Sequence, residues 1–238
     1  MWRMPYSIAL NLGRLPRLVQ TMHRMADRPD LFTRQDGYAY VRYIIGLMKK
    51  TGHMGTECSG RENLPREGGY LLCPNHQGKY DAYSIVDVHD RPLSLVMDRE
   101  QSYYVFISEI VDLLGGKRMD IHDARQGLTV IKQVAKELEE GIPHIIIPEG
   151  GYDNQKHNTL WEFKPGCFKA ATKSKTPIVP TVLVDSYKVY NSWKFGPIKT
   201  QVHYLKPICY EEYLNLNTHQ IAELVKSRIQ EKLTELGC

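Results

Sequence analysis

The sequence lacks a long apolar run. A helix that spans a membrane needs about 20 consecutive apolar residues, but three arginines interrupt the first apolar stretch and Arg42 interrupts the second. We therefore expect a chain that does not span a membrane. The apolar part of residues 1–12 is broken by Pro5, Ser7 and Asn11, and no small-residue cleavage site follows, so we also expect no secretion.

Cysteine is scarce, and its spacing argues against two classes of small scaffold. The five cysteines form no Cys-x-x-Cys pair. An odd number without paired spacing speaks against a disulfide framework or a zinc ribbon and favours a reducing compartment. Internal repeats, low-complexity tracts and flexible linkers are absent too. With 238 residues, 42% of them apolar and 24% charged, the chain is long enough for one α/β domain with a full core.

Positive charge is concentrated near the amino end. The total net charge is +4, but residues 1–50 carry nine Lys or Arg against three Asp, a net of +6, so the remainder carries −2. Apolar and aromatic side chains, among them Trp2 and Tyr6, are interleaved with these charges. Such a basic amphipathic segment is typical of one that lies on an anionic bilayer surface. Two ordinary helices packed on the core are the alternative, and no signature of a nucleic-acid-binding fold accompanies the charge.

The order of apolar segments predicts an α/β fold with a mainly parallel central sheet flanked by helices, because strand-like runs alternate with helical stretches. We predict strands at 69–73, 93–97, 143–147, 177–184 and 201–208. Two helices are clear, one between a capping Asp123 and Gly141, the other from about Thr218 to Leu236. A change of composition near residues 55–65 divides an N-terminal amphipathic helical segment, residues 1–58, from residues 59–238.

His76 and Asp81 lie where a predicted strand gives way to a helix. Pro74 ends the strand, and residues 81–86 can continue as a helix. Residues five apart lie about 140° apart around a helix, so we expect His76 in the turn and Asp81 in the first helical turn. A carboxylate on one imidazole nitrogen fixes the tautomer, and the other nitrogen can then take a proton from a hydroxyl. Chance alone predicts about half of one such spacing in this chain, so the pair needs further support.

Later segments give that support. Ile147-Pro148-Glu149-Gly150 follows an apolar run, and residues 163–171 and 177–183 follow in order, the last with internal prolines. Together with Asn75-His76-x-x-x-x-Asp81, these segments resemble the glycerolipid acyltransferase family, the PlsC-type 1-acylglycerol-3-phosphate acyltransferases. The resemblance runs from about residue 60 to residue 183, half of the chain, and its first and third blocks are the specific ones.

The resemblance implies direct acyl transfer, in which His76 takes the proton of a lipid or glycerol hydroxyl and Asp81 stabilises the imidazolium. It implies an acyl-CoA or acyl-carrier-protein donor, lysophosphatidic acid as the acceptor, and no bound cofactor or metal. Residues 59–238 are then the catalytic domain, peripheral on the cytoplasmic face of a membrane. The substrate-binding residues that we expect are Asn75, Lys117, Arg118, Glu149, Gly150 and Gly151. Among them Glu149 would orient the acceptor, the glycine amides would face the thioester oxyanion, and the two cations would hold a phosphate.

Two blocks depart from the family pattern. Ile121 stands where an Arg is usual after Asp120, and Gly151-Tyr152-Asp153 stands where many members have Thr-Arg-Ser. These positions usually hold the acceptor's phosphate, so the chemistry carries over more safely than the acceptor. Three alternatives therefore stay open: the same chemistry on glycerol phosphate or another lysolipid, a lipid-binding protein without turnover, and a thioester hydrolase that uses Cys73 as its nucleophile.

Overall fold

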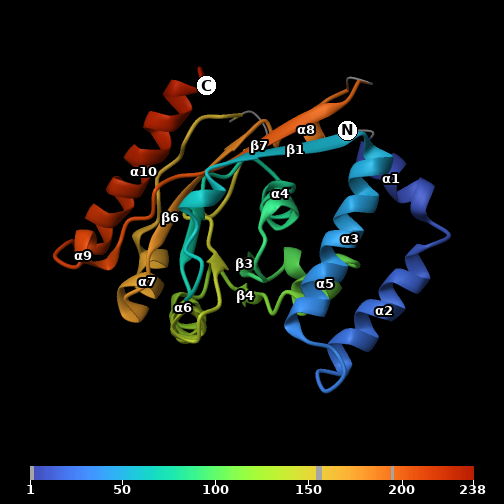
Figure 1. Cartoon of the computed structure of the whole chain (residues 1–238), viewed down its shortest axis with the longest axis horizontal. Helices are drawn as coiled ribbons and strands as arrows, with labels where there is room; N and C mark the ends of the chain where they lie inside the picture. The colour runs from blue at the N-terminus through green and yellow to red at the C-terminus, as the bar shows by residue number, and fades with distance from the viewer. Residues whose placement is uncertain (1–2, 154–156, 194–195) are drawn as a thin grey trace.

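The computed structural model describes residues 3–153, 157–193 and 196–238, so Trp2 lies outside the described residues. Within this part of the chain a seven-stranded sheet forms the centre of the molecule (Figure 1). Its spatial order is β1 (Met54–Ser59), β7 (Ile198–Tyr204), β6 (Ile178–Val184), β2 (Leu71–Pro74), β5 (His144–Ile145), β3 (Ser94–Asp98) and β4 (Lys117–Met119). Neighbouring strands pair in parallel except β6 and β7, which are antiparallel. The predicted mainly parallel α/β fold is confirmed.

The sequence analysis misses the two edge strands, β1 and β4. Lys117 and Arg118, which the sequence analysis expects to hold a phosphate, lie in β4 and pair with Val96 and Met97 of β3. An edge strand has a neighbour on one side only and does not need the continuous apolar run of a strand buried in the middle of a parallel sheet. Short polar edge strands therefore leave little signal in the sequence.

Helices cover both faces of the sheet. Over the described residues they are α1 (Arg3–Asn11), α2 (Leu15–Asp27), α3 (Arg34–Gly52), α4 (Asp81–Val88), α5 (Ile107–Leu113), α6 (Ala124–Glu139), α7 (Lys169–Ser174), α8 (Lys188–Asn191), α9 (Tyr210–Tyr213) and α10 (Thr218–Glu235). Three short 3-10 turns are η1 (Arg61–Asn63), η2 (Gln101–Tyr103) and η3 (Pro165–Phe168). The two predicted helices correspond to α6 and α10. The carboxylate of Asp123 caps α6 by accepting from the backbone N–H groups of Arg125 and Gln126.

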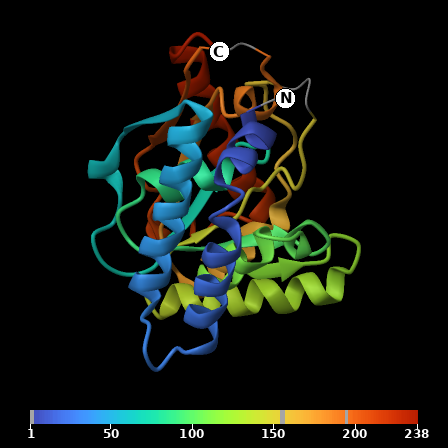
Figure 2. The same ribbon diagram turned by 90° about the vertical axis from the view of Figure 1, so that its right-hand side faces the viewer.

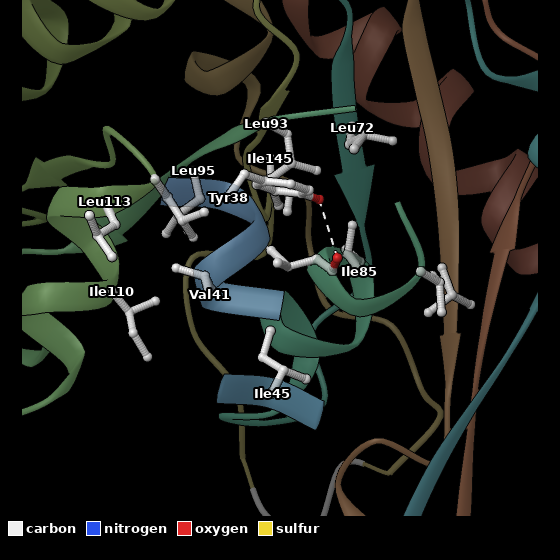
Figure 3. Close-up of a cluster of buried hydrophobic side chains, with 14 of the residues drawn as sticks. Tyr38, Val41, Ile45, Leu72, Ile85, Leu93, Leu95, Ile110, Leu113 and Ile145 are labelled. Atoms are coloured by element: carbon white, nitrogen blue, oxygen red, sulfur yellow. Dashed lines mark hydrogen bonds between the residues drawn. The ribbon is translucent and has the colours of Figure 1, made fainter. Parts of the chain in front are cut away.

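Alternate residues of the strands supply two separate apolar cores. Leu72 of β2 faces the core beneath α3, α4 and α5, whereas its neighbours Leu71 and Cys73 face the core beneath α6, α7 and α10. In Figure 1 the first group of helices lies to the right of the sheet, with α7 and α10 to the left. The first core is shown in Figure 3, where Tyr38 of α3 reaches into it and donates a hydrogen bond of 3.2 Å to the carbonyl of Val86.

The polar side of α1 faces inward. Arg3, Ser7 and Asn11, spaced four apart, are buried. Arg3 donates to the carbonyl of Gly52 at 3.0 Å, and the hydroxyl of Ser7 lies 2.6 Å from that of Thr51. The large apolar side chains that α1 and the following turn expose are Tyr6, Ile8, Leu10 and Leu12, each between 43% and 64% exposed. This is the reverse of an ordinary surface helix, which buries its apolar face.

Helices α2 and α3, which precede the strands in the sequence, contribute to the first core. Leu18 and Met22 of α2 are buried with Val41 of α3 in the first core, and both helices stand in front of the molecule in Figure 2. The division predicted between residues 58 and 59 falls inside β1. No helix in the described ranges is both long and apolar enough to cross a membrane.

Candidate active site

Four neighbouring parallel strands end at one edge of the sheet. Since β2, β5, β3 and β4 lie side by side in that order, their carboxyl ends meet, which is where open α/β sheets bind ligands. His76 follows β2, Glu149 follows β5, Arg99 follows β3 and Asp120 follows β4. The topology thus brings together the motifs that lie about seventy residues apart in the sequence.

His76 and Asp81 form a hydrogen-bonded pair. The Nδ1 atom of His76 lies 2.6 Å from Oδ2 of Asp81, and Asp81 is the first residue of α4, as the five-residue spacing predicts. The same carboxylate oxygen accepts from the backbone N–H groups of Gln77 at 2.6 Å and Gly78 at 3.0 Å. The Asp81 side chain is 1% exposed and that of His76 is 17% exposed, so the pair is shielded but reachable. A carboxylate held in this way fixes the histidine tautomer with Nε2 as the nitrogen that can accept a proton.

Ser186 and Gln77 support Asp81 from a distant part of the chain. The hydroxyl of Ser186 donates to the second carboxylate oxygen of Asp81 and also lies 2.9 Å from Oε1 of Gln77. Gln77 in turn donates to the carbonyl of Leu183 at 2.9 Å. The sequence analysis does not find Ser186, because it follows β6 without a motif of its own and meets Asp81 only through the fold.

The side chains of Asn75 and Glu149 form hydrogen bonds with backbone groups in this structure. Asn75 is fully buried, accepts from the N–H of Leu183 at 2.7 Å and donates to the carbonyl of the same residue at 3.0 Å. The carboxylate of Glu149, 3% exposed, accepts from the N–H of His76 at 2.8 Å and from the N–H of Trp161 at 2.7 Å. These contacts fix the loops around His76. The expected acceptor-binding role of the two side chains gains no support from them.

Lys117 and Arg118 are not brought to the site. Lys117 forms an ion pair of 2.5 Å with Glu137, and Arg118 forms one of 2.8 Å with Asp112 while its guanidinium lies 4.9 Å from the ring centre of Tyr103. Neither residue lines the cavity described below. The expected phosphate contact is missing because both residues lie in an edge strand and their side chains pair with neighbouring acidic residues.

A cavity of about 1170 Å³ opens beside His76. This volume exceeds the roughly 300 to 1,000 Å³ of ordinary small-molecule pockets. Apolar side chains of β3, α4 and α5 line its inner part, and Val86, Leu95, Ile110 and Leu114 also belong to the first core. Near His76 the wall of the cavity contains backbone from residues 146–153, the segment after β5. In this segment Gly150 has a φ of +65°, a conformation that favours glycine.

Two cations line the described part of the cavity besides its histidines, namely Lys79 after β2 and Arg99 after β3. Acidic residues also line it. The carboxylate of Asp98 accepts from the N–H of Gln101, and that of Asp120 accepts from the N–H of His122, so both already bind backbone. No cluster of three potential metal ligands occurs among the described residues.

Cys73 is placed for packing. It is fully buried in the second core, and burial raises the pKa of its thiol well above the usual range, with the charge of Cys167 acting in the same direction. A protonated thiol away from the cavity is a poor nucleophile. The hydrolase alternative therefore loses its proposed nucleophile.

A family comparison agrees with this geometry. The model of the family described as Acyltransferase matches residues 55–184, more than half of the chain and the part that holds His76, Asp81 and the segment after β5. The chain belongs to the acyltransferase family. Its fold is also that of a solved relative, the crystal structure of the 1-acyl-sn-glycerophosphate (LPA) acyltransferase, PlsC, from Thermotoga maritima. That structure has a TM-score of 0.75 and 17% identity, and the match covers 99% of this chain and 96% of that one.

Two curated relatives of this acyltransferase carry the same name. The 1-acyl-sn-glycerol-3-phosphate acyltransferase of Saccharomyces cerevisiae is 24% identical over 82% of this chain and 65% of its own length, just under two thirds. The enzyme of the same name from Escherichia coli is 22% identical over 82% of this chain and 79% of its own length. The family rests on the family model, and at these identities the acceptor has to be argued from the site.

Proposed function

We propose that this acyltransferase moves a fatty acyl group from an acyl thioester to the free hydroxyl of lysophosphatidic acid, giving phosphatidic acid for phospholipid biosynthesis. The observation that carries the proposal is the His76–Asp81 hydrogen bond of 2.6 Å in the wall of a large, mainly apolar cavity. A base beside an apolar cavity suits an acceptor with a reactive hydroxyl and a donor with a long acyl chain. The names of the curated relatives support the same acceptor.

His76 acts first as a general base. It takes the proton of the acceptor hydroxyl as that oxygen attacks the thioester carbonyl, and Asp81 stabilises the imidazolium that forms. The tetrahedral intermediate then collapses, the carbon–sulfur bond breaks, and the imidazolium returns the proton to the leaving thiolate. The products are the new ester and the free thiol of the carrier, so atoms and charge balance without a cofactor.

The segment after β5 faces this reaction. Gly150 and Gly151 line the cavity, and their lack of side chains lets the thioester oxygen approach the backbone there. The N–H of Gly150 already donates to the carbonyl of Ile147 at 3.3 Å, so the N–H of Gly151 is the donor that we assign to this oxygen. A side chain at position 150 would be strained by the φ of +65° and would displace the flexible end of Lys164, whose Nζ lies 2.6 Å from the position of an added Cβ. Glu149 supports the step indirectly, because it holds the backbone of His76.

In this proposal Lys79 and Arg99 bind the acceptor's phosphate. They follow β2 and β3, the strands on either side of β5, and thus flank the Gly150 segment. They take over the role expected of Lys117 and Arg118, which are ion-paired outside the cavity. Charge-assisted contacts of this kind discriminate an anionic headgroup from a neutral one.

The donor and the membrane complete the proposal. An acyl-CoA or an acyl carrier protein supplies the thioester, and the apolar part of the cavity holds its acyl chain. The outward apolar side chains of α1, with the exposed Arg14 and Arg17 beside them, contact an anionic membrane surface from its cytoplasmic face. This surface contact keeps the enzyme beside its lipid acceptor as a peripheral protein.

The test is transfer by the purified protein from labelled acyl-CoA and from labelled acyl carrier protein to a panel of acceptors. Lysophosphatidic acid, glycerol 3-phosphate and lysophosphatidylcholine form the panel, and mass spectrometry identifies the products. We expect phosphatidic acid as the main product. Replacing His76 by Ala should reduce the rate by about 100-fold to 10,000-fold, and Asp81→Asn should come close to that loss.

The controls separate the alternatives. Cys73→Ala should retain most of the activity, because Cys73 packs in the second core, and trapping of an acyl group on Cys73 would overturn the mechanism. Preferred acylation of another acceptor would replace lysophosphatidic acid in the proposal. Near-parental transfer by the His76→Ala variant, measured where chemistry limits the rate, would refute the role of His76. Binding of lipid with no transfer to any acceptor would favour a lipid-binding protein.

A further inference from the structure

Tyr152 lies against the ring of His76. The two ring centres are 4.7 Å apart and the ring planes are inclined by 66°, an edge-to-face arrangement. Tyr152 follows Gly151 at the end of the segment after β5, and it lines the same cavity as His76. Position 152 is one of those at which the chain departs from the family pattern, and here it places an aromatic ring against the base.

Two contacts of the imidazole come from different parts of the fold. Asp81, at the start of α4, binds Nδ1 and fixes the direction of that edge of the ring. A hydrogen bond at one ring nitrogen leaves the ring able to tilt about that bond. Tyr152 lies in the segment that follows β5, the neighbour of β2, and its ring packs against the imidazole ring itself. Together the two contacts determine where Nε2 points.

The ring of Tyr152 also suits the charge that His76 acquires during transfer. Burial raises the pKa of the Tyr152 phenol, and the negative charge of Asp81 raises it further, so the side chain stays neutral. The neutral ring therefore places no competing charge beside the imidazolium that forms as the hydroxyl loses its proton.

We propose that Tyr152 is a positioning residue for His76, whose ring holds the tilt of the imidazole. This inference rests on the proposed function, in which His76 is the general base. The aromatic ring is the active part of the side chain, and the phenolic hydroxyl is dispensable. Phenylalanine should therefore replace tyrosine, and leucine should not.

Steady-state kinetics of three variants test the inference. Edge-to-face aromatic pairs contribute the equivalent of about a two- to tenfold change in an equilibrium or a rate. Tyr152→Leu should therefore lower kcat by about two- to tenfold with the KM values of acceptor and donor unchanged, whereas Tyr152→Phe should stay within about twofold of the parent. The matched control is Tyr210→Leu, which removes one ring of another edge-to-face pair, with Tyr213 at 5.4 Å, outside the cavity lining. It should leave kcat unchanged.

A double-mutant comparison separates positioning from substrate contact. In a His76→Ala background, Tyr152→Leu should produce no further loss of the residual rate, because the group that it positions is gone. An equal loss in both backgrounds would overturn the inference. So would a rise in the acceptor KM that Phe and Leu share, since the hydroxyl would then bind substrate.

A measurement without turnover distinguishes failure of this inference from failure of the proposed function. In protein labelled with ¹³C-histidine, the ring signal of His76 is assigned by its loss in His76→Ala. Tyr152→Leu should shift this signal and Tyr152→Phe should leave it nearly in place, whether or not any acceptor is acylated. If neither variant moves the signal, the ring of Tyr152 does not hold His76 and the inference fails. Circular dichroism spectra that match the parent exclude loss of the fold as the cause of a shift.

Discussion

At the residue scale, the fold fixes the positions of His76 and Asp81 mostly through hydrogen bonds with backbone groups. Asp81 accepts from two backbone N–H groups as well as from His76, and Glu149 accepts from the N–H of His76. Each of these acceptors is almost fully buried. A buried carboxylate with several donors keeps one orientation, because any rotation would leave donors unpaired. The base is thus placed before any substrate arrives.

The phosphate contact gives a prediction at this scale. Arg99→Gln should raise the acceptor KM about tenfold or more, because losing a charge-assisted hydrogen bond costs roughly 1.5 to 3 kcal/mol. Lys79→Gln should act in the same direction, and the donor KM should change little in either variant. Initial rates at varied concentrations of each substrate measure this. Arg125→Gln, an exposed cation in the first turn of α6 outside the cavity lining, is the control.

An effect of Arg99→Gln on the donor KM alone would reassign Arg99 to the phosphates of the carrier. Lys117→Gln tests the earlier expectation from the sequence in the same assay. Because Lys117 is paired with Glu137, we expect the acceptor KM to stay unchanged in that variant, with any loss confined to stability.

At the scale of elements, α1 has features of both structures that the sequence analysis treats as alternatives, a helix packed on the core and a segment with an apolar surface for a membrane. It packs on the molecule through Arg3, Ser7 and Asn11, and it also exposes its apolar side chains. Deleting residues 1–22 is therefore a poor test of membrane binding. Leu18 and Met22 belong to the first core, and their loss would destabilise the whole domain.

Point substitutions on the outer side of α1 give a cleaner prediction. Ile8→Glu combined with Leu12→Glu should leave the fold intact, since these side chains are 49% and 64% exposed. Binding to anionic vesicles, measured by sedimentation at low salt, should fall on the order of tenfold or more, because each apolar side chain lost from the interface is worth about 1.5 to 3 kcal/mol. Binding by the parent should weaken as salt screens the basic residues.

The control for this prediction is Leu214→Glu, which changes an equally exposed leucine, 48% exposed, next to α9. It should leave vesicle binding unchanged. Activity of the α1 variant should fall more on a membrane-embedded acceptor than on a short soluble one, since the residues around His76 are untouched. Equal vesicle binding by the α1 variant and the parent would place the membrane contact elsewhere on the molecule.

At the scale of the whole molecule, a buried histidine makes stability depend on pH. His89 is fully buried, its Nδ1 lies 2.6 Å from the carbonyl of Arg91, and its Nε2 lies 2.7 Å from the hydroxyl of Tyr70. Because a carbonyl can only accept, Nδ1 carries the hydrogen and Nε2 accepts from Tyr70. Burial lowers the pKa of His89 from 6.5 to about 4. The folded protein therefore keeps this ring neutral where the unfolded chain protonates it.

The sign of the effect follows from proton uptake. Between pH about 6.5 and about 4 the unfolded chain binds a proton at His89 that the folded state does not, so the free energy of unfolding falls as the pH falls. The complete loss is on the order of 3 kcal/mol. Urea unfolding curves at intervals from pH 7 to pH 4 should show it. Burial also lowers the pKa of His144, so it adds to the slope in the same direction.

His89→Gln is the matched variant, since an amide cannot take up the proton. It should be less stable at pH 7, and its unfolding free energy should decline less steeply toward pH 4 than that of the parent. Identical slopes for parent and variant would show that His89 is not the group responsible.

The sequence by itself determined the class of fold and the reacting pair. Alternating apolar runs are a property of neighbouring residues, so they reveal the buried strands β2, β3 and β6 and the amphipathic helices α6 and α10. The pairing of His76 with Asp81 is also local, because a turn followed by a helix brings residues five apart together. The segment around Glu149 could be associated with them because its residue types and order match a family.

Tertiary structure alone decided the rest. Ser186 meets Asp81 across more than 100 residues, and Tyr152 meets His76 because β5 lies next to β2. Lys117 and Arg118 look available in the sequence, but an edge strand turns them toward Glu137 and Asp112. The inverted burial of α1 likewise depends on Thr51 and Gly52 receiving its polar side. Contacts of this kind depend on which strands become neighbours, and local sequence patterns carry no information about that order.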